Sequence, residues 1–340
     1  MKEVLVTGGT GYIGSHTVVE LHNSGYKAII VDNLSNSHRS MLKRLEDITG
    51  VTPKFYKKDL KDQESLREVF KENNITSVIH FAASKAVSES VNKPLLYYKN
   101  NLLGTINLLE LMEAYHVSSM IFSSSCTVYG EPDKLPVTEN SEIKPANSPY
   151  GNTKQVCEEI IKDAIASNDA LQAISLRYFN PIGAHDSGKI GEFPSGIPNN
   201  LMPYLLEVAA GKLEQLSVFG DDYNTPDGSC IRDYIHVVDL AKAHVVSLQR
   251  LLQNKAKEKY GVFNLGTGTG YSVLDIITTF EKTIGKKLNY KVVDRRPGDV
   301  EKIYADTSYA NDKLGWKAKS GLEEMLQSSW KWQQRLMEET

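Results

Sequence analysis

The sequence has few cysteines, no long apolar run and no excess of one charge, and each shortage excludes a class of protein. Its 340 residues include 3 cysteines, an odd number at wide spacings, so neither a disulfide framework nor a CxxC metal or redox site is predicted. No segment reaches the ~18 apolar residues of a membrane span, and the N-terminal apolar run is too short for a signal peptide. We therefore expect a cytoplasmic protein that does not bind membranes.

The charges are nearly balanced, which limits the partners that the chain can bind through general electrostatics. There are 39 Lys and Arg against 42 Asp and Glu, a formal net charge of −3, which argues against a general nucleic-acid binder. The 8 histidines form no HExxH or HxH pattern, so no metal site is predicted. Any charged ligand must be bound by a local group of residues.

Short apolar runs alternate with longer helical patterns through the first half, as in successive βα units with a parallel sheet. We predict an α/β protein with a Rossmann-type doubly wound parallel sheet and a smaller C-terminal α/β domain. The segments from 181 to 233 are rich in Gly, Pro and Asn and lack periodicity, which indicates long functional loops. The strands are expected at Val4–Thr7, Ala28–Val31, Lys54–Tyr56, Ser77–Phe81, Ser119–Ser123, Ala173–Arg177 and Val262–Asn264. The helices are expected at Ser15–Asn23, Gln63–Glu72, Pro94–Tyr115, Tyr150–Ala166, Val238–Leu252 and Val273–Ile284.

A glycine-rich turn follows the first strand. Gly8, Gly11 and Gly14 have the spacing GxxGxxG, which permits a tight turn and brings a pyrophosphate close to the N–H groups at a helix N-terminus. Asp32 ends the next predicted strand, where a carboxylate accepts hydrogen bonds from both ribose hydroxyls and repels a 2′-phosphate. The ordered set of strand, glycines, helix, strand and acid predicts an NAD site rather than a simple turn.

Three hydroxyl residues end one strand, and a tyrosine and a lysine begin the following predicted helix. Tyr150 and Lys154 are four residues apart, so they share a helix face and the ammonium can favour an ionised phenol. Ser125 follows Ser123 and Ser124 at the strand end. We predict that Tyr150 is a base, supported by Lys154, and that Ser125 hydrogen-bonds the same substrate oxygen.

These motifs resemble the extended short-chain dehydrogenase/reductase family, and within it the nucleotide-sugar 4-epimerases. The strings GGTGYIGSHT, HFAASKAVSESV, SPYGNTK, LRYFNPIGAH, GIPNNLMPY and IRDYIHVVDLA occur in order, and the likeness extends from residue 5 to about residue 310. It implies reversible inversion of carbon 4 of a UDP-hexose through a 4-keto sugar, with NAD as cofactor and a homodimer as the assembly. It also implies an NAD domain at 1–180, to which 236–262 return, and a nucleotide-sugar domain at 181–235 and 263–340.

The resemblance assigns site residues one by one. NAD is expected at Gly8, Gly11, Tyr12, Ile13, Gly14, Asp32, Asn33, Asn36, Ser37, Asp59, Leu60, Phe81, Ala82, Ala83, Lys85, Asn100, Ser123, Tyr150, Lys154 and Tyr178. The UDP-sugar is expected at Lys85, Ser125, Tyr150, Phe179, Asn180, Asn200, Leu201, Ser217, Phe219, Arg232, Tyr234, Arg296, Asp299 and Ile303.

Two departures from the family pattern leave alternatives open. Ile303 stands where a tyrosine narrows the sugar pocket or a small residue admits an N-acetyl group, so an epimerase for UDP-N-acetylglucosamine or for both sugars is an alternative. Cys126 replaces the usual alanine after Ser125.

A nucleotide-sugar dehydratase needs an Asp-Glu pair at this point, where the chain has Cys126 and Thr127. A regulator that only binds a dinucleotide has no need for Tyr150 and Lys154.

Overall fold

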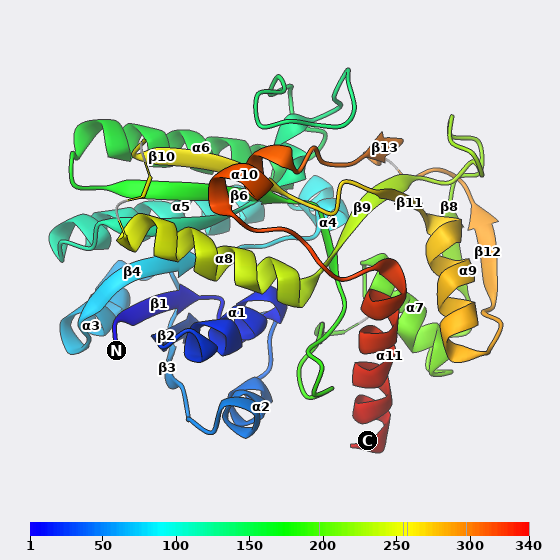
Figure 1. Cartoon of the computed structure of the whole chain (residues 1–340), viewed down its shortest axis with the longest axis horizontal. Coiled ribbons are helices and arrows are strands. Elements are labelled where there is room, and N and C mark those ends of the chain that lie inside the picture. Colours follow the sequence, from blue (N-terminus) through cyan, green and yellow to red (C-terminus); the bar gives the residue numbers. More distant parts are fainter. Residues whose placement is uncertain (197, 254, 257, 297, 340) are drawn as a thin grey trace.

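A parallel seven-stranded sheet forms the larger part of the molecule (Figure 1). The computed structural model describes residues 1–196, 198–253, 255–256, 258–296 and 298–339, so Ile197 of the string GIPNNLMPY lies outside the described residues. The strands are β1 (Glu3–Thr7), β2 (Lys27–Asp32), β3 (Lys54–Lys57), β4 (Ile75–His80), β5 (Ser119–Ser125), β6 (Gln172–Tyr178) and β10 (Tyr260–Leu265). Their order is β10-β6-β5-β4-β1-β2-β3, with parallel neighbours throughout. The prediction of a Rossmann-type doubly wound sheet is confirmed.

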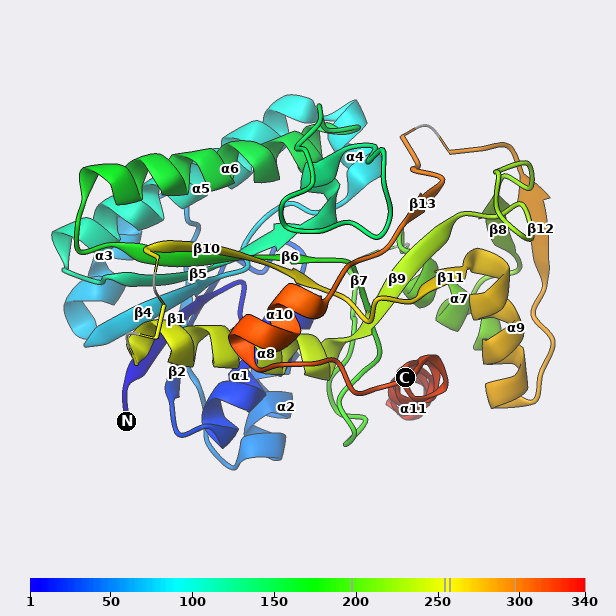
Figure 2. The same ribbon diagram turned by 45° about the horizontal axis from the view of Figure 1, so that its top comes forward.

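Helices cover both faces of this sheet, which explains why its strands read as apolar runs. Side chains alternate along β1, so Val4 and Val6 belong to the core on one face and Leu5 to the core on the other. The first face is covered by α1 (Tyr12–Asn23), α2 (Ser40–Thr49), α8 (Val237–Leu252) and α10 (Ser308–Leu314). The second face is covered by α3 (Gln63–Glu72), α5 (Pro94–Ala114) and α6 (Pro149–Ser167). Figure 2 shows α5 and α6 on the side of the sheet opposite α8.

Short strands and three helices form the smaller part, beyond the carboxyl ends of the main strands (Figure 2). Strand β9 (Ile231–His236) pairs in parallel with β7 (Asn180–Ile182) and β13 (Lys302–Ile303), and antiparallel with β11 (Gly270–Ser272). Strand β8 (Leu216–Phe219) pairs with β12 (Tyr290–Val293). The helices α7 (Leu201–Ala209), α9 (Val273–Ile284) and α11 (Leu322–Glu338) share a separate apolar core there. Two short helices complete the described elements, α4 (Val87–Asn92) before α5 and the 3-10 helix η1 (Cys126–Tyr129) after β5.

The structure corrects the expected irregularity between residues 181 and 233. This segment contains α7, β8 and the first half of β9. The strand β8 has only four residues, too few for an alternating pattern to stand out from the surrounding turns. Helix α9 begins where the sequence predicts it, and Ser272 and Asp275 form a reciprocal capping box there.

Two further observations concern the membrane and the cysteines. The described part of the chain has no helix that is both long and apolar enough to cross a bilayer. All three cysteines are free and buried, and the same residues contain no group of three or more His, Cys, Asp or Glu able to hold a metal ion.

Candidate active site

The turn between β1 and α1 forms a backbone cradle. Gly8 has a φ of +72°, and a Cβ there would lie 2.9 Å from the backbone nitrogen of Ala82. A Cβ on Gly14 would lie 2.2 Å from the carbonyl oxygen of Gly8, so only glycine fits at these two positions. Gly11 is the N-cap of α1 and has no side chain to cover the first N–H groups of the helix. This arrangement fits a pyrophosphate at the positive end of a helix dipole.

The carboxylate of Asp32 lies at the end of β2, beside this cradle. It is 8% exposed and accepts hydrogen bonds from the backbone nitrogens of Thr10 (3.2 Å) and Leu34 (2.9 Å) and from the Ser37 hydroxyl (3.0 Å). An ionised carboxylate only accepts hydrogen bonds, so this position suits the hydroxyls of a ribose and disfavours a 2′-phosphate. The residues present therefore fit NAD.

A lysine that the sequence motifs did not single out joins the residues predicted further along the same edge. Lys61 Nζ donates hydrogen bonds to Asp59 Oδ2 and to Asn100 Oδ1, both at 3.0 Å. Burial raises the pKa of Asp59, but hydrogen bonds from Lys61 and Asn33 outweigh burial and lower it. This cluster links the loop after β3 to α5.

The other predicted NAD residues also lie at the carboxyl edge of the main sheet, where ligands bind in open α/β folds. They come from the start of α1, the loops after β2, β3 and β4, and the ends of β5 and β6; they are Tyr12, Ile13, Asn33, Asn36, Leu60, Phe81, Ala83, Lys85, Ser123 and Tyr178.

Tyr150 and Lys154 lie in the first turns of α6, beside the end of β5. The helix begins there because Ser148 caps it and Pro149 occupies its first position. The Lys154 ammonium donates a hydrogen bond to the carbonyl oxygen of Ser123 at 2.6 Å and lies 5.9 Å from the centre of the Tyr150 ring. The Ser123 hydroxyl is also hydrogen-bonded to the hydroxyl of Tyr178. The fold thus brings together the residues that the spacing alone suggested.

Burial dominates the protonation of these groups. Burial raises the pKa of the Tyr150 phenol above its usual value near 10, while a hydrogen bond with Ser125 works in the opposite direction. Burial also lowers the pKa of Lys154 from 10.5 to about 8. The expected effect of Lys154 on Tyr150 is therefore smaller than the cost of burying the phenolate.

A buried ionic network lies behind the catalytic candidates, and the motifs did not reveal it. Arg177 donates to both carboxylate oxygens of Glu158, at 3.0 and 2.6 Å, and the Ser124 hydroxyl donates to the same carboxylate at 2.6 Å. Both ionic side chains are at most 5% exposed. Glu158 lies one helical turn after Lys154, and Arg177 directly precedes Tyr178, so the network connects α6, β5 and β6 at the site. The i+4 spacing from Lys154 to Glu158 is the only signal in the sequence.

Charged residues from distant segments meet in the smaller part of the molecule. Arg296 forms two hydrogen bonds with Asp299, at 3.1 and 2.6 Å. Arg232 lies 3.9 Å from the same carboxylate, and the Arg296 guanidinium lies 5.5 Å from the centre of the Phe219 ring. Each guanidinium has five N–H donors, so donors remain for an anionic ligand, and Phe219, which is 40% exposed, offers an aromatic face.

The remaining predicted substrate residues come from β7, β8, β9 and the start of α7. Asn180 of β7 is paired in register with Tyr234 of β9, and burial raises the pKa of Tyr234 to about 12. Asn200 and Leu201 begin α7, and Ser217 lies in β8.

Ile303 packs in one apolar cluster with Cys126 and Phe179. In the chain, Cys126 directly follows Ser125, and Phe179 directly follows Tyr178. Burial raises the pKa of the Cys126 thiol to about 12. This cysteine is therefore a packed thiol rather than a reactive thiolate.

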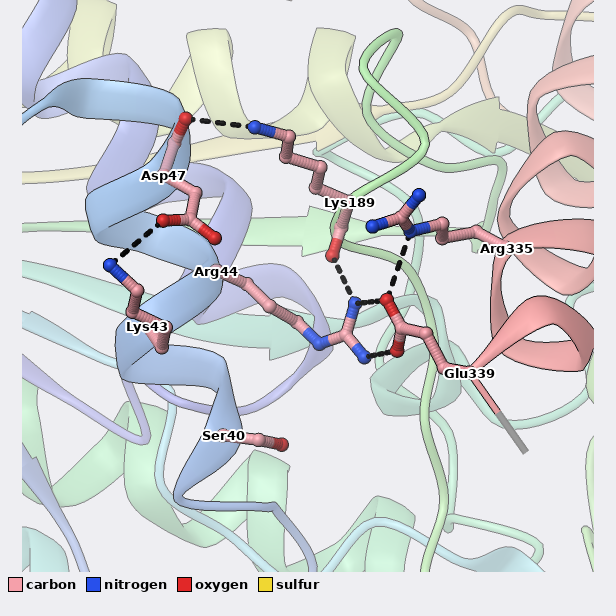
Figure 3. A pocket seen from close by; sticks show the side chains of 7 residues that line it. All are labelled: Ser40, Lys43, Arg44, Asp47, Lys189, Arg335 and Glu339. Carbon is pink, nitrogen blue, oxygen red and sulfur yellow. Dashed lines mark hydrogen bonds and ion pairs between the residues drawn. The ribbon is translucent and has the colours of Figure 1, made fainter.

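A cavity of about 230 Å³ lies elsewhere, between α2, the loop at Lys189 and the end of α11 (Figure 3). Its charged groups pair with one another: Arg44 and Arg335 both contact the Glu339 carboxylate, and Lys189 Nζ donates to the backbone oxygen of Asp47 at 3.0 Å. Because its ionic groups are already paired, this cavity is better described as a contact between the two parts of the molecule than as a ligand site.

Comparison with known proteins places this geometry in a family. Residues 5–329 match the family described as GDP-mannose 4,6 dehydratase. A UDP-glucose 4-epimerase of Bacillus subtilis (strain 168) is 56% identical over 330 residues, covering 97% of this chain and 96% of that protein.

Solved structures agree with the sequence match. The crystal structure of UDP-glucose 4-epimerase from Bifidobacterium longum in complex with NAD+ and UDP is 50% identical, has a TM-score of 0.95 and covers 98% of both chains. The UDP-glucose 4-epimerase from Stenotrophomonas maltophila, with bound NAD and formylated UDP-arabinopyranose, is 46% identical, with a TM-score of 0.96 and full coverage of both chains.

Proposed function

The chain belongs to the UDP-glucose 4-epimerases, and we propose that it interconverts UDP-glucose and UDP-galactose. In this reaction Tyr150 is the base, and Lys154 and Ser125 are its partners. The group of Arg232, Arg296 and Asp299 anchors the nucleotide. The observation that carries this proposal is the meeting of Tyr150, Lys154 and Ser125 beside the glycine cradle, at one edge of the sheet. An enzyme of this family is an NAD-dependent isomerase.

The residues at the sheet edge would hold NAD. The cradle of Gly8, Gly11 and Gly14 would hold the pyrophosphate, Asp32 would bind the ribose hydroxyls, and Asn33, Asp59 and Asn100 would lie next to them. Bound at these residues, NAD would supply reversible hydride transfer at carbon 4 of the sugar.

Tyr150 removes the proton of the 4-hydroxyl group, and Ser125 donates or accepts a hydrogen bond at the same oxygen. Because burial raises the pKa of Tyr150, the phenolate needs a neighbouring positive charge, and the Lys154 ammonium supplies one. Ser123 holds this ammonium through its carbonyl oxygen. The same groups return the proton when the sugar is reduced again.

The nucleotide end and the sugar end need different properties. Arg232 and Arg296 offer forked donors to a diphosphate, and Phe219 offers a stacking face to the base. The sugar must rotate between its two reduced states, so its pocket must tolerate both orientations. Isoleucine at position 303 is intermediate in size between a tyrosine and a small residue, which favours plain hexoses and leaves UDP-N-acetylglucosamine as a weaker alternative substrate.

We also propose the assembly, the domain boundaries and the compartment. Leu95, Leu96 and Ile106 of α5 are 79%, 48% and 37% exposed, which supports a homodimer formed through α5 and α6. Residues 1–180 with 236–262 form the NAD domain, and 181–235 with 263–340 the nucleotide-sugar domain. Three free, buried cysteines are typical of a reducing compartment, which favours the cytoplasm.

The test uses the purified protein without added cofactor. Denaturing the protein releases its nucleotide for identification, and incubation with UDP-galactose is followed by analysis of the sugars. We expect NAD and a mixture of UDP-galactose and UDP-glucose. A 4-keto-6-deoxy sugar would indicate a dehydratase instead, and bound NAD without any conversion would indicate a regulator.

A further inference from the structure

Two of the predicted ligand-binding side chains meet on a carboxylate that neither motif nor resemblance singles out. Glu192 lies in the loop between β7 and α7, and its side chain is 13% exposed. Its Oε1 atom accepts a hydrogen bond from Lys85 Nζ at 3.0 Å and one from Asn200 Nδ2 at 3.1 Å. One oxygen therefore connects Lys85, on the NAD side of the site, to Asn200, on the nucleotide-sugar side.

The backbone around Glu192 is held in place from the other side. Trp332 of α11 donates from Nε1 to the carbonyl oxygen of Glu192 at 3.0 Å, and this indole is 1% exposed. Next in the chain, Phe193 packs edge-on against Trp332 and lies 4.2 Å from the His38 ring, centre to centre. The carboxylate thus rises from a fixed support rather than from a free loop.

The two donors keep capacity for a ligand. An ammonium has three N–H donors and an amide nitrogen two, so one bond each to Glu192 leaves two donors on Lys85 and one on Asn200. Both side chains are exposed to solvent. Asn200 is also the N-cap of α7, and its amide is turned toward Glu192, which leaves the start of this helix open to an anion.

We propose that Glu192 is a positioning residue for the UDP-sugar, which orients Lys85 and Asn200 before the nucleotide binds. The proposal rests on the proposed function, since it concerns the substrate of that site. Orientation before binding reduces the entropy that is lost when the ligand orders these side chains. In the opposite role, the carboxylate would compete with the diphosphate for the same donors. Removal of the carboxylate therefore weakens UDP binding in the first role and strengthens it in the second.

The experiment separates binding from turnover in the NAD-loaded protein. UDP binding is measured by calorimetric titration, and KM and kcat are measured with UDP-galactose. We expect Glu192→Ala to raise the Kd for UDP and the KM about tenfold, and Glu192→Gln, which keeps an acceptor oxygen, about threefold, with kcat within about twofold of wild type.

A matched control is available at Glu3, the first residue of β1, at the end of the strand opposite the site. Glu3 accepts from Lys27 Nζ and from the backbone nitrogen of Asn74, both at 2.7 Å, and is 17% exposed. Glu3→Gln should leave Kd and KM unchanged. In a protein that already carries Asn200→Ala, the further change Glu192→Ala should weaken UDP binding much less than the same change does in the wild type. The reason is that Glu192 acts in part through Asn200.

Three outcomes would overturn the proposal. Tighter UDP binding by Glu192→Ala would show that the carboxylate competes with the ligand, a fall in kcat at unchanged KM would show a general structural role, and full additivity with Asn200→Ala would show that the two residues act separately. UDP binding needs no turnover, so a protein that binds UDP without epimerising it would refute the proposed function and leave the role of Glu192 open to this test.

Discussion

The catalytic candidates and the proposed nucleotide anchor are built in different ways. Ser125, Lys154 and their support by Glu158 and Arg177 come from β5, α6 and β6, three packed elements, and these side chains are at most 7% exposed. Arg232, Arg296 and Phe219 come from short strands and loops that are far apart in the sequence. Arg296 and Phe219 are both more than a third exposed.

The difference matches what each region must do. Proton transfer requires reacting atoms to be held at a fixed separation, which a buried, ion-paired group on rigid elements provides. The sugar must be released and bound again in a second orientation while its nucleotide stays attached. Arg232 and Arg296, which share the Asp299 carboxylate, can anchor a diphosphate without restricting the sugar.

The largest expected effect is on the catalytic side. Tyr150→Phe should lower kcat by ~10²–10⁴, the usual contribution of a general base, with little change in NAD binding. Tyr260→Phe is the matched control, since Tyr260 is another partly buried tyrosine whose hydroxyl is hydrogen-bonded to a serine, Ser175, at 2.8 Å. Near-normal kcat in Tyr150→Phe, measured by the rate of UDP-galactose conversion, would mean that another group is the base.

The second effect concerns the support of the catalytic centre. Glu158→Gln leaves Arg177 buried without a counter-charge, and breaking such a pair typically costs about 3–5 kcal/mol of folding free energy. Glu159→Gln removes the neighbouring carboxylate, which is 67% exposed and pairs with Lys162, and should cost less than about 1 kcal/mol. Denaturant unfolding measures both, and equal losses would show that the buried pair supports the catalytic centre no more than an exposed ion pair does.

The third effect is on pH dependence and follows from the pKa of Lys154, which burial lowers from 10.5 to about 8. Since the ammonium is the form that favours the phenolate, kcat should fall above about pH 8, by up to about tenfold per pH unit. Between these two pKa values the unfolded chain binds more protons than the folded chain, so the contribution of Lys154 to stability rises with pH there. A kcat that increases steadily up to about pH 10 would contradict this role.

The fourth effect is on the nucleotide side. Arg296→Ala should weaken UDP binding about tenfold, as expected for the loss of a charge-assisted contact, and should leave the melting temperature nearly unchanged. Arg295→Ala is the control because Arg295 is the adjacent residue, is 48% exposed and pairs with Asp222. If both variants bind UDP equally well, the anchor has been placed on the wrong residues.

The last expected effect is confined to one substrate and concerns sugar choice. Ile303→Tyr adds volume to the cluster with Cys126 and Phe179, and such additions typically cost ~1–3 kcal/mol. The kcat/KM for UDP-N-acetylglucosamine should therefore fall roughly tenfold while that for UDP-glucose is retained. Ile303→Val serves as the conservative control, and an equal loss for both sugars would show that Ile303 does not line the pocket at carbon 2.

The sequence predicted the larger part of the fold well because its signals are local. The apolar runs of β1, β2, β4, β5 and β6 are largely buried, whereas the edge strand β3 has no buried residue. The glycines of the first turn are required for steric reasons that the GxxGxxG spacing already indicates. The sequence did not reveal the roles of Lys61, Arg177 and Glu192, because each contacts a residue far away in the chain. Their partners are Asn100, Glu158 and Lys85, and the separations range from 19 to 107 residues. Such pairings depend on topology, which spacing along the chain does not encode.

The most direct test of the central claim follows the hydrogen on carbon 4. The purified protein is incubated with UDP-galactose that carries deuterium at carbon 4, and the product is analysed by nuclear magnetic resonance. Hydride removal and return within one closed site predict UDP-glucose with the deuterium retained at carbon 4 and the configuration inverted. Replacement of the deuterium by solvent hydrogen, or a product that has lost a hydroxyl group, would contradict the account.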